Sequence, residues 1–223
     1  MSAAAPYDAV ILAGGRSTRL GGRPKALLLT GGRTLLETTL AAVPDARNIA
    51  VAGPPELSTL LGPPAPGGSS GIPLLVREEP AYAGPAAAVG AAVVALAAAG
   101  ERNAGERNKD SGGSPWTMVL ACDMPQVASA VRALLEAAAT PDVESLLAVD
   151  SGGNRQPLAA LYRTADLRAA VDSLASEGLA NKSMKALLAR VQWRGVDVPP
   201  SSTADVDTWN DAQSLGVSAG DLP

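Results

Sequence analysis

Short runs of apolar residues alternate along the chain with longer, helix-like segments. This alternation is typical of an α/β fold with a mainly parallel sheet. The predicted strands are 9–13, 48–52, 73–76, 117–121, 145–149, 158–162 and 191–194. The predicted helices are 34–42, 85–99, 127–138, 164–176, 183–189 and 206–215.

Two segments between these elements have the composition of solvated loops. Residues 62–71 are rich in Pro, Gly and Ser, and residues 101–115 are polar. Such clusters rarely pack into a core. Because neither segment interrupts the alternation, we expect one domain over residues 1–223, with a core of roughly 8–215. The last residues, 216–223, are expected to form a frayed tail.

Composition narrows the class of protein further. The chain of 223 residues is 47% hydrophobic without any Phe, so its core must be mainly aliphatic. A net charge of −4 argues against a nucleic-acid-binding protein with a broad basic surface. The absence of histidine excludes serine–histidine and cysteine–histidine catalysis, and Cys122, the single cysteine, excludes an intramolecular disulfide.

The N-terminal residues and the apolar segments give no sign of a membrane partner. The N-terminus lacks the basic and apolar regions of a signal peptide. The longest apolar stretch, 85–99, is shorter than the ~20 residues needed to span a bilayer. We therefore expect a cytoplasmic protein.

The segment 10–28, which reads VILAGGRSTRLGGRPKALL, is the most informative part of the chain. It begins as a buried strand and breaks into a glycine-rich loop at Gly14 and Gly15. Glycines allow backbone N–H groups to approach an anion closely, and basic side chains supply the countercharge. The basic residues of this loop are Arg16, Arg19, Arg23 and Lys25. A strand that leads into such a loop predicts a phosphate-binding site.

A second candidate site follows the predicted strand 117–121, where Asp123 stands at its carboxyl end. In open α/β sheets, ligands bind beyond the carboxyl ends of the strands. A carboxylate there can hold Mg²⁺, which prefers oxygen ligands and bridges phosphates. The alternative is that Asp123 caps the helix predicted at 127–138.

The first loop resembles the signature LAGGxSxRxGxxKxLL of nucleotidyltransferases similar to molybdenum cofactor guanylyltransferase. Every fixed position is present, with one extra residue between Gly21 and Lys25. The CDxP motif of the same family is similar to 122–125, and the resemblance covers roughly residues 8–215. It implies a Rossmann-like three-layer nucleotidyltransferase fold. The nucleotide-binding residues that it implies are Leu12, Ala13, Gly14, Gly15, Arg16, Ser17, Lys25, Glu79 and Gly84.

Other matches to this family are partial. Glu79 stands near a family aspartate, although a solvated acidic turn explains it equally well. Residues Arg155 and Gln156 match a stretch on the side that receives the second substrate. Asn181 and Lys182 precede a helix whose N-terminus could accept an anion, but for Lys182 a solvated basic face is the favoured interpretation.

Two further positions bear on the metal and on the base. Asp207 precedes the last helix and is either a second metal ligand or, as we favour, the cap of that helix. The guanine-contacting asparagine of the family is not found after the second strand, where this chain reads Val51, Ala52, Gly53, Pro54. The base specificity therefore stays open.

The resemblance implies transfer of a nucleoside monophosphate from an NTP onto a phosphorylated acceptor, with release of pyrophosphate. In the family the donor is GTP and the acceptor is molybdopterin, with Mg²⁺ as cofactor and proteins that deliver the molybdenum cofactor as partners. The implied catalytic residues are Arg19, Lys25 and Asp123. Because the acceptor phosphate is already a nucleophile, no general base is required, which agrees with a chain that lacks histidine.

Three alternatives remain. Cytidylyl transfer to the same cofactor or to a sugar or polyol phosphate is favoured by the pair Pro24 and Lys25, whereas the LAGG form of the loop favours guanylyl transfer. A lactate-phosphate guanylyltransferase with a similar fold is the second. The third is a nucleotide-binding protein without catalytic activity, against which the set of Arg19, Lys25 and Asp123 argues.

Overall fold

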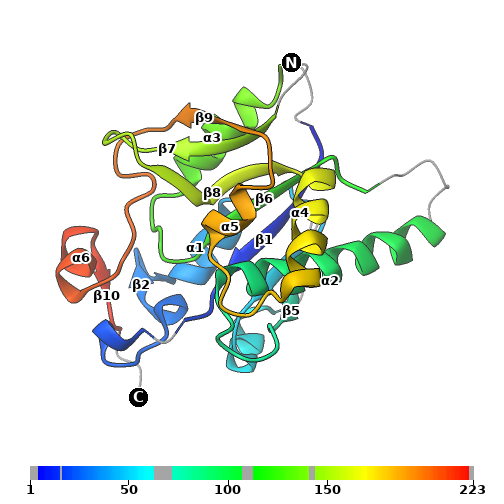
Figure 1. Cartoon of the computed structure of the whole chain (residues 1–223). Coiled ribbons are helices and arrows are strands. Elements are labelled where there is room, and N and C mark those ends of the chain that lie inside the picture. Colours follow the sequence, from blue (N-terminus) through cyan, green and yellow to red (C-terminus); the bar gives the residue numbers. More distant parts are fainter. Residues whose placement is uncertain (1–4, 16, 63–71, 107–112, 141–143, 221–223) are drawn as a thin grey trace.

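The computed structural model describes residues 5–15, 17–62, 72–106, 113–140 and 144–220. Its centre is a seven-stranded sheet with the order β5-β4-β1-β6-β8-β7-β9 (Figure 1). All neighbouring strands are parallel except where β8 pairs with β6 and β7, so the predicted mainly parallel sheet is confirmed. The strands are β1 (Tyr7–Leu12), β4 (Ile49–Ala52), β5 (Leu74–Val76), β6 (Trp116–Ala121), β7 (Ser145–Val149), β8 (Arg155–Arg163) and β9 (Trp193–Asp197).

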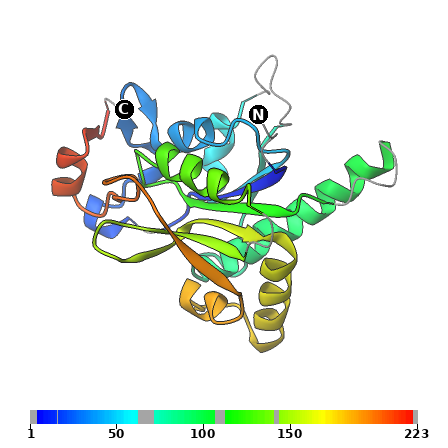
Figure 2. The same cartoon turned by 90° about the horizontal axis from the view of Figure 1, so that it is seen from above.

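Helices cover both faces of this sheet, which confirms the three-layer arrangement that the family resemblance implies. Figure 2 shows α1 (Leu35–Ala41) and α3 (Ala128–Ala137) on one face. The other face is covered by α2 (Pro85–Glu106), α4 (Thr164–Glu177) and α5 (Met184–Leu188). None of the described helices is both long enough and apolar enough to cross a membrane.

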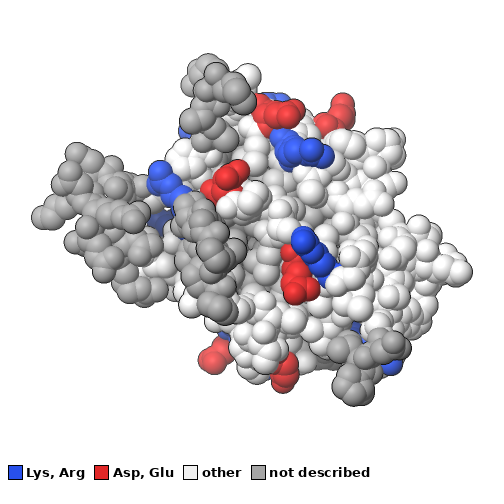
Figure 3. Space-filling view, turned by 180° about the vertical axis from the view of Figure 1, so that it is seen from behind, with Lys and Arg blue, Asp and Glu red and all other residues white. Residues whose placement is uncertain are grey.

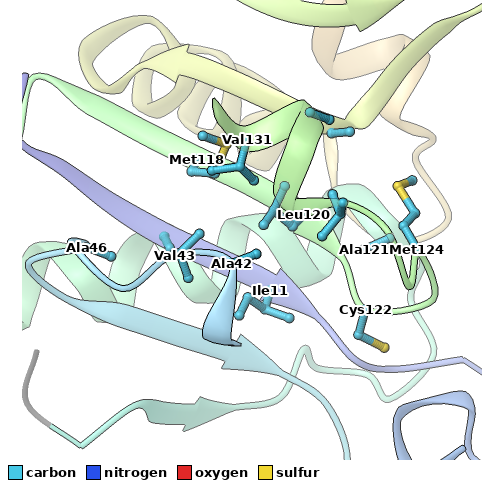
Figure 4. Packing of buried hydrophobic residues seen from close by; sticks show 14 of the residues in the cluster. Ile11, Ala42, Val43, Ala46, Met118, Leu120, Ala121, Cys122, Met124 and Val131 are labelled. Carbon is cyan, nitrogen blue, oxygen red and sulfur yellow. The ribbon is translucent and has the colours of Figure 1, made fainter. Parts of the chain in front are cut away.

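The central strands β1, β4 and β6 are buried on both faces because both faces are covered. In β1, Tyr7, Ala9 and Ile11 belong to the core cluster beneath α1 and α3, whereas Val10 and Leu12 belong to the cluster beneath α2 and α4. This division follows from the two-residue period of a strand. Figure 4 shows the first cluster, in which the labelled side chains are small, aliphatic or sulfur-containing, as a sequence without Phe requires.

All seven predicted strands and six predicted helices are found, with shifted ends. The largest shift is in α2, which continues to Glu106 rather than ending at residue 99. The prediction of a loop from residue 101 is therefore wrong for 101–106. Those residues include Glu, Arg and Ala, which are strong helix formers, and no proline that would end the helix. Residues 107–112, and 63–71 of the other predicted loop, lie outside the described residues.

A second, three-stranded sheet was not predicted. It has the order β10-β2-β3 and consists of β2 (Leu29–Thr30), β3 (Arg33–Thr34) and β10 (Val217–Ser218). Gly31 and Gly32, both with positive φ, form the turn between β2 and β3, and a Gly-Gly pair is a recognised hairpin signal. The frayed tail predicted from residue 216 is wrong at β10, because Val217 is buried and pairs with β2.

Acidic and basic side chains are interspersed over the face shown in Figure 3, with wide uncharged areas between them. The charges that matter for the candidate chemistry are gathered instead at one edge of the main sheet.

Candidate active site

Three parallel strands end together at this edge. Leu12, the last residue of β1, is in register with Ala52 of β4 and with Ala121 of β6. The loop after β1 therefore lies between Gly53 on one side and Cys122 and Asp123 on the other. Two backbone hydrogen bonds extend the pairing beyond the strands, from the Ala13 N–H to the Ala52 carbonyl (2.8 Å) and from the Cys122 N–H to the Leu12 carbonyl (3.0 Å). The two sites predicted from sequence thus face the same edge of the sheet.

Lys25 joins the two predicted sites directly. This residue lies in the short 3-10 helix η2 (Lys25–Leu27), and its Nζ donates to Asp123 Oδ2 at 2.8 Å and to Asp207 Oδ1 at 2.6 Å. The side chains of Lys25 and Asp123 are only 20% and 18% exposed, which limits screening of their attraction by water. Desolvation alone would lower the pKa of Lys25, but the two carboxylates outweigh it and raise that pKa. Lys25 is therefore a fixed positive charge.

Arg19 lies farther from the centre of this cluster. It belongs to the 3-10 helix η1 (Thr18–Leu20), and its guanidinium is 3.6 Å from Asp207 Oδ2. Its side chain is 72% exposed, so it is free to reach toward a ligand. Gly21, with φ 68°, closes η1 in the left-handed conformation that glycine adopts without strain.

Asp207 reaches the cluster because the segment before α6 (Trp209–Ser214) is attached to the loop after β6. The Val206 N–H donates to the Asp123 carbonyl at 3.0 Å, and Val206 is buried. Thr208, not Asp207, is the N-cap of α6, in a capping box with Asp211. Our preference for Asp207 as the helix cap is therefore wrong. Asp123 caps no helix either, since Val127 occupies that position in α3.

A third carboxylate, Asp205, joins Asp123 and Asp207. Ligand atoms of the three side chains lie within 4.8 Å of one another. Partial desolvation and the charges of Asp123 and Asp207 raise the pKa of Asp205. Three carboxylates at this spacing could hold a divalent cation, because Mg²⁺ and similar ions prefer oxygen ligands. The sequence contained a signal for Asp205, since residues 205 and 207 of an extended chain point to the same side.

A cavity of about 440 Å³ lies beside Lys25. Of the residues predicted to bind a nucleotide, five are among its lining: Ala13, Gly14, Gly15, Ser17 and Lys25. Leu12 is buried in β1, and Arg16 lies outside the described residues. The remaining lining comprises Gly22, Pro24, Leu27, Pro54, Glu56, Leu57 and Tyr82. Sequence reasoning missed Pro54, Glu56, Leu57 and Tyr82, because no motif marks them.

The loop before α2 contributes Tyr82 rather than Glu79 to the described lining. Glu78 organises this loop, since its Oε1 accepts from the Tyr82 N–H at 3.0 Å. Gly84 packs against a neighbouring loop: a Cβ there would lie 3.4 Å from the Lys182 carbonyl oxygen, and the Asn181 N–H donates to the Ala83 carbonyl. The nucleotide-binding roles of Glu79 and Gly84 stay predictions.

The residues predicted to bind the acceptor have partners within the protein. The Arg155 guanidinium lies 4.7 Å from the centre of the Trp193 ring, and Gln156 Nε2 donates to Asp150 Oδ2 at 3.2 Å. Both stand where antiparallel β8 begins, which is the edge where β1 ends. Lys182 lies 3.9 Å from Glu177. An acceptor-binding role for Arg155, Gln156, Asn181 and Lys182 stays a prediction.

Cys122 is a buried core residue. It packs in the cluster beneath α1 and α3, and burial raises the pKa of its thiol (Figure 4). A thiol with a raised pKa is a poor nucleophile at neutral pH. The chemistry at this edge therefore depends on Lys25, the three carboxylates and the backbone of the glycine-rich loop.

Comparison with known proteins gives a consistent result. The family described as MobA-like NTP transferase domain matches residues 9–194. The chain is 30% identical over 200 residues to a molybdenum cofactor guanylyltransferase of Rhizobium meliloti (strain 1021), covering 88% of this chain and 80% of that protein. A second relative, the 2-C-methyl-D-erythritol 4-phosphate cytidylyltransferase of Thermus thermophilus, is 59% identical over 46 residues, or 21% of this chain and 22% of the relative.

The fold also matches solved structures. The crystal structure of molybdopterin-guanine dinucleotide biosynthesis protein A from Archaeoglobus fulgidus superposes with a TM-score of 0.64 at 16% identity. The match covers 94% of this chain and 96% of the other. At this identity the likeness supports the fold, and the fold predicted from the resemblance is confirmed.

Proposed function

Because this chain belongs to the MobA-like NTP transferase family and is thus a nucleotidyltransferase, we propose that it transfers GMP from GTP onto the terminal phosphate of molybdopterin. The observation that carries this proposal is the convergence of Lys25, Asp123 and Asp207 beside the cavity of the glycine-rich loop. A fixed cation, a group of carboxylates and free backbone amides form a set suited to a metal-bound triphosphate.

The residues of the cavity divide the binding of the triphosphate between them. Gly14, Gly15 and Ser17 line the cavity, and we assign the two glycine N–H groups and the Ser17 hydroxyl to the phosphates. Lys25 and the exposed Arg19 neutralise the charge that develops around the α-phosphorus. Positioning and charge neutralisation account for most of the catalysis in reactions of this kind.

The reaction exchanges one phosphorus–oxygen bond for another. An oxygen of the acceptor phosphate forms a bond to the α-phosphorus of GTP. The bond from that phosphorus to the α,β-bridging oxygen breaks, and pyrophosphate leaves with the bonding electrons. A phosphate monoester is largely ionised at neutral pH, since its second pKa is about 6, so no side chain has to remove a proton. The absence of histidine is compatible with this chemistry.

We assign Asp123 and Asp207, with Asp205, to a Mg²⁺ ion. When bound there, such an ion would supply neutralisation of charge on the phosphate oxygens, and the three carboxylates would hold it. The carboxylates fit this assignment because all three offer oxygen atoms within one ion's reach. Lys25 competes with a metal for the same oxygens, and a triphosphate offers its ammonium another partner.

The guanylyl donor and the molybdopterin acceptor are supported by the Rhizobium relative, whose similarity extends over most of the chain. The Thermus relative is more similar over a much shorter stretch, and it makes CTP the competing donor. We place the acceptor beside the start of β8, toward Arg155 and Gln156, with Asn181 and Lys182 as further candidates.

A pyrophosphate-release assay with GTP, CTP, ATP and UTP, each with and without molybdopterin, tests the proposal. We expect stoichiometric release with GTP and Mg²⁺ only when molybdopterin is present, and a guanylylated product by mass spectrometry. Release with CTP alone among the four would instead identify a cytidylyltransferase. Binding of a nucleotide without turnover on any phosphorylated acceptor would contradict the assignment as a transferase.

A further inference from the structure

We propose that Glu56 reads the base of the bound nucleotide and that its carboxylate selects guanine, an inference that rests on the proposed function. It concerns the part of the cavity lining whose chemistry differs most from that of the phosphate site. Glu56 is exposed and lies in the 3-10 helix η3 (Pro55–Leu60), directly after β4.

The lining of the cavity has two chemically different parts. Gly14, Gly15 and Lys25 offer backbone amides and a positive charge, which suit phosphates. The segment after β4 contributes instead the apolar side chains of Pro54 and Leu57, together with the carboxylate of Glu56. Apolar walls with a single polar group suit a flat heterocycle, whose faces need packing and whose edge needs hydrogen bonds.

Gly53 holds this segment close to the glycine-rich loop. Its N–H donates to the Val76 carbonyl at 2.9 Å. A Cβ at position 53 would lie 2.8 Å from Leu57 Cδ1 and 3.3 Å from the Ala13 carbonyl oxygen. A side chain at position 53 would therefore have to displace Leu57 and press on the Ala13 carbonyl, and the glycine that stands there offers no side-chain group to a base. Glu56, three residues later, is the acidic side chain among the described lining residues.

The charge of Glu56 is informative because it has the same sign as that of the expected ligand. A carboxylate repels a triphosphate. In a cavity otherwise lined by glycines, a lysine, apolar groups, Ser17 and Tyr82, the carboxylate therefore indicates a ligand group that donates hydrogen bonds. Within the described part of the chain, no residue donates a hydrogen bond to this carboxylate or forms an ion pair with it. Its acceptor oxygens are available.

Guanine is the base that satisfies a carboxylate best. Its Watson–Crick edge carries two adjacent donors, the N1–H and the 2-amino group, which can pair with the two oxygens of one carboxylate. Adenine and cytosine each present one amino donor beside a ring nitrogen that is an acceptor, and uracil presents one N–H between two carbonyl oxygens. The acceptors of these three bases would face the carboxylate and repel it.

The test compares GTP with ITP, which lacks only the 2-amino group, by titration calorimetry on the full chain with Mg²⁺ and without acceptor. The wild-type protein should bind GTP roughly tenfold more tightly than ITP, the value of one charged hydrogen bond. Glu56→Ala should weaken GTP binding roughly ten- to a hundredfold and bring the GTP and ITP affinities within about twofold of each other. Glu136→Gln, on an exposed position of α3, is the matched control and should change neither affinity.

Glu56→Gln tests the direction of the hydrogen bonds with little change of shape. The amide of glutamine offers one acceptor and one donor, which match the amino group and N1 of adenine. We therefore expect this variant to lower the ratio of the GTP affinity to the ATP affinity by at least about tenfold. A change in base preference would show that Glu56 recognises the base. A purely structural role would instead weaken the binding of all nucleotides equally.

Two outcomes would overturn the assignment. If the wild-type protein binds GTP but the difference between GTP and ITP survives in both Glu56 variants, another group reads the base and the proposed function is unaffected. If the folded wild-type protein binds CTP and not GTP, both the base assignment and the guanylyl donor are wrong.

Discussion

At the scale of single residues, Lys25 connects segments that lie far apart in the sequence. Its ammonium contacts carboxylates 98 and 182 positions away, and the resulting cluster exists only because the chain folds. In this arrangement the single charge of the lysine offsets part of the negative charge of Asp123 and Asp207. Lys25 also lines the cavity, where its ammonium could pair with a triphosphate instead.

Lys25→Met should lower kcat/KM for nucleotidyl transfer by about 10²–10³-fold, because it removes a preorganised charge from the reacting phosphates. Steady-state kinetics with saturating Mg²⁺ measure this loss. Lys185→Met is the matched control, since Lys185 is exposed on α5, and should retain wild-type activity. Near-normal turnover of Lys25→Met would remove Lys25 from the site.

Asp123→Asn should abolish detectable transfer and weaken Mn²⁺ binding by at least roughly tenfold, while thermal unfolding shifts little. The amide keeps the size of the side chain but loses the charge that a divalent cation requires. Titration of Mn²⁺ followed by electron paramagnetic resonance gives a readout independent of activity. Asp172→Asn, at an exposed position of α4, controls for the loss of one negative charge, and equal Mn²⁺ affinity in the two variants would contradict the metal assignment.

At the scale of elements, the capping of the helix ends determines which side chains remain available to the candidate active site. Thr34 with Glu37, and Thr208 with Asp211, form capping boxes at the starts of α1 and α6. Because Thr208 caps α6, the side chain of Asp207 is free to reach Lys25. The three-residue spacing of the two members of each capping box is present in the sequence, so the sequence pattern itself favours Thr208 over Asp207 as the cap of α6.

The extension of α2 beyond residue 99 can be tested by Gly100→Ala. No neighbouring atom lies within 4 Å of a Cβ added at Gly100. If the helix continues through this position, alanine should raise the free energy of unfolding by about 0.5–1 kcal/mol, because glycine is the poorer helix former. Urea denaturation measures the change. An unchanged or lowered stability would place the end of the helix before Gly100.

At the scale of the whole molecule, a small apolar cluster holds the two halves of the site together. Leu20 and Leu28 flank Lys25 in sequence, and they pack with Val206, which lies between Asp205 and Asp207. The cluster is completed by Leu35, Ala212 and Val217 from α1, α6 and β10. The second sheet and α6 therefore position the last two carboxylates against the first loop.

Val206→Ala should lower the free energy of unfolding by about 2 kcal/mol, since it removes two buried methyl groups and leaves a cavity. It should also lower the transfer rate by about tenfold or more at a temperature where the protein stays folded, because small displacements of Asp205 and Asp207 misalign the site. Val171→Ala deletes the same groups from the core beneath α2 and α4. This control should lower the free energy of unfolding by a similar amount with little loss of the transfer rate. Equal transfer rates in the two variants would contradict the positioning role of Val206.

Much of the main sheet was predictable because its strands and helices repeat local patterns. Buried strands read as apolar runs, and the loop after β1 and Asp123 follow such runs directly, so their edge could be inferred from the parallel order of the strands. The second sheet was harder to predict, since its strands have two residues each and are held by partners at opposite ends of the chain. Pro54, Glu56, Leu57 and Tyr82 carried no motif either, because a cavity wall requires only proximity.

The sequence by itself determined the alternation of strands and helices, the glycine-rich cationic loop and the carboxylate after β6, since each depends on residues close together in the chain. The tertiary structure alone decided that Asp205 and Asp207 lie together with Asp123, and that Glu56 and Gly14 line the same cavity. The physical reason is that the local sequence pattern reflects the secondary-structure propensity and the burial of each segment. The composition of a site depends instead on which distant segments the packing brings within hydrogen-bonding distance.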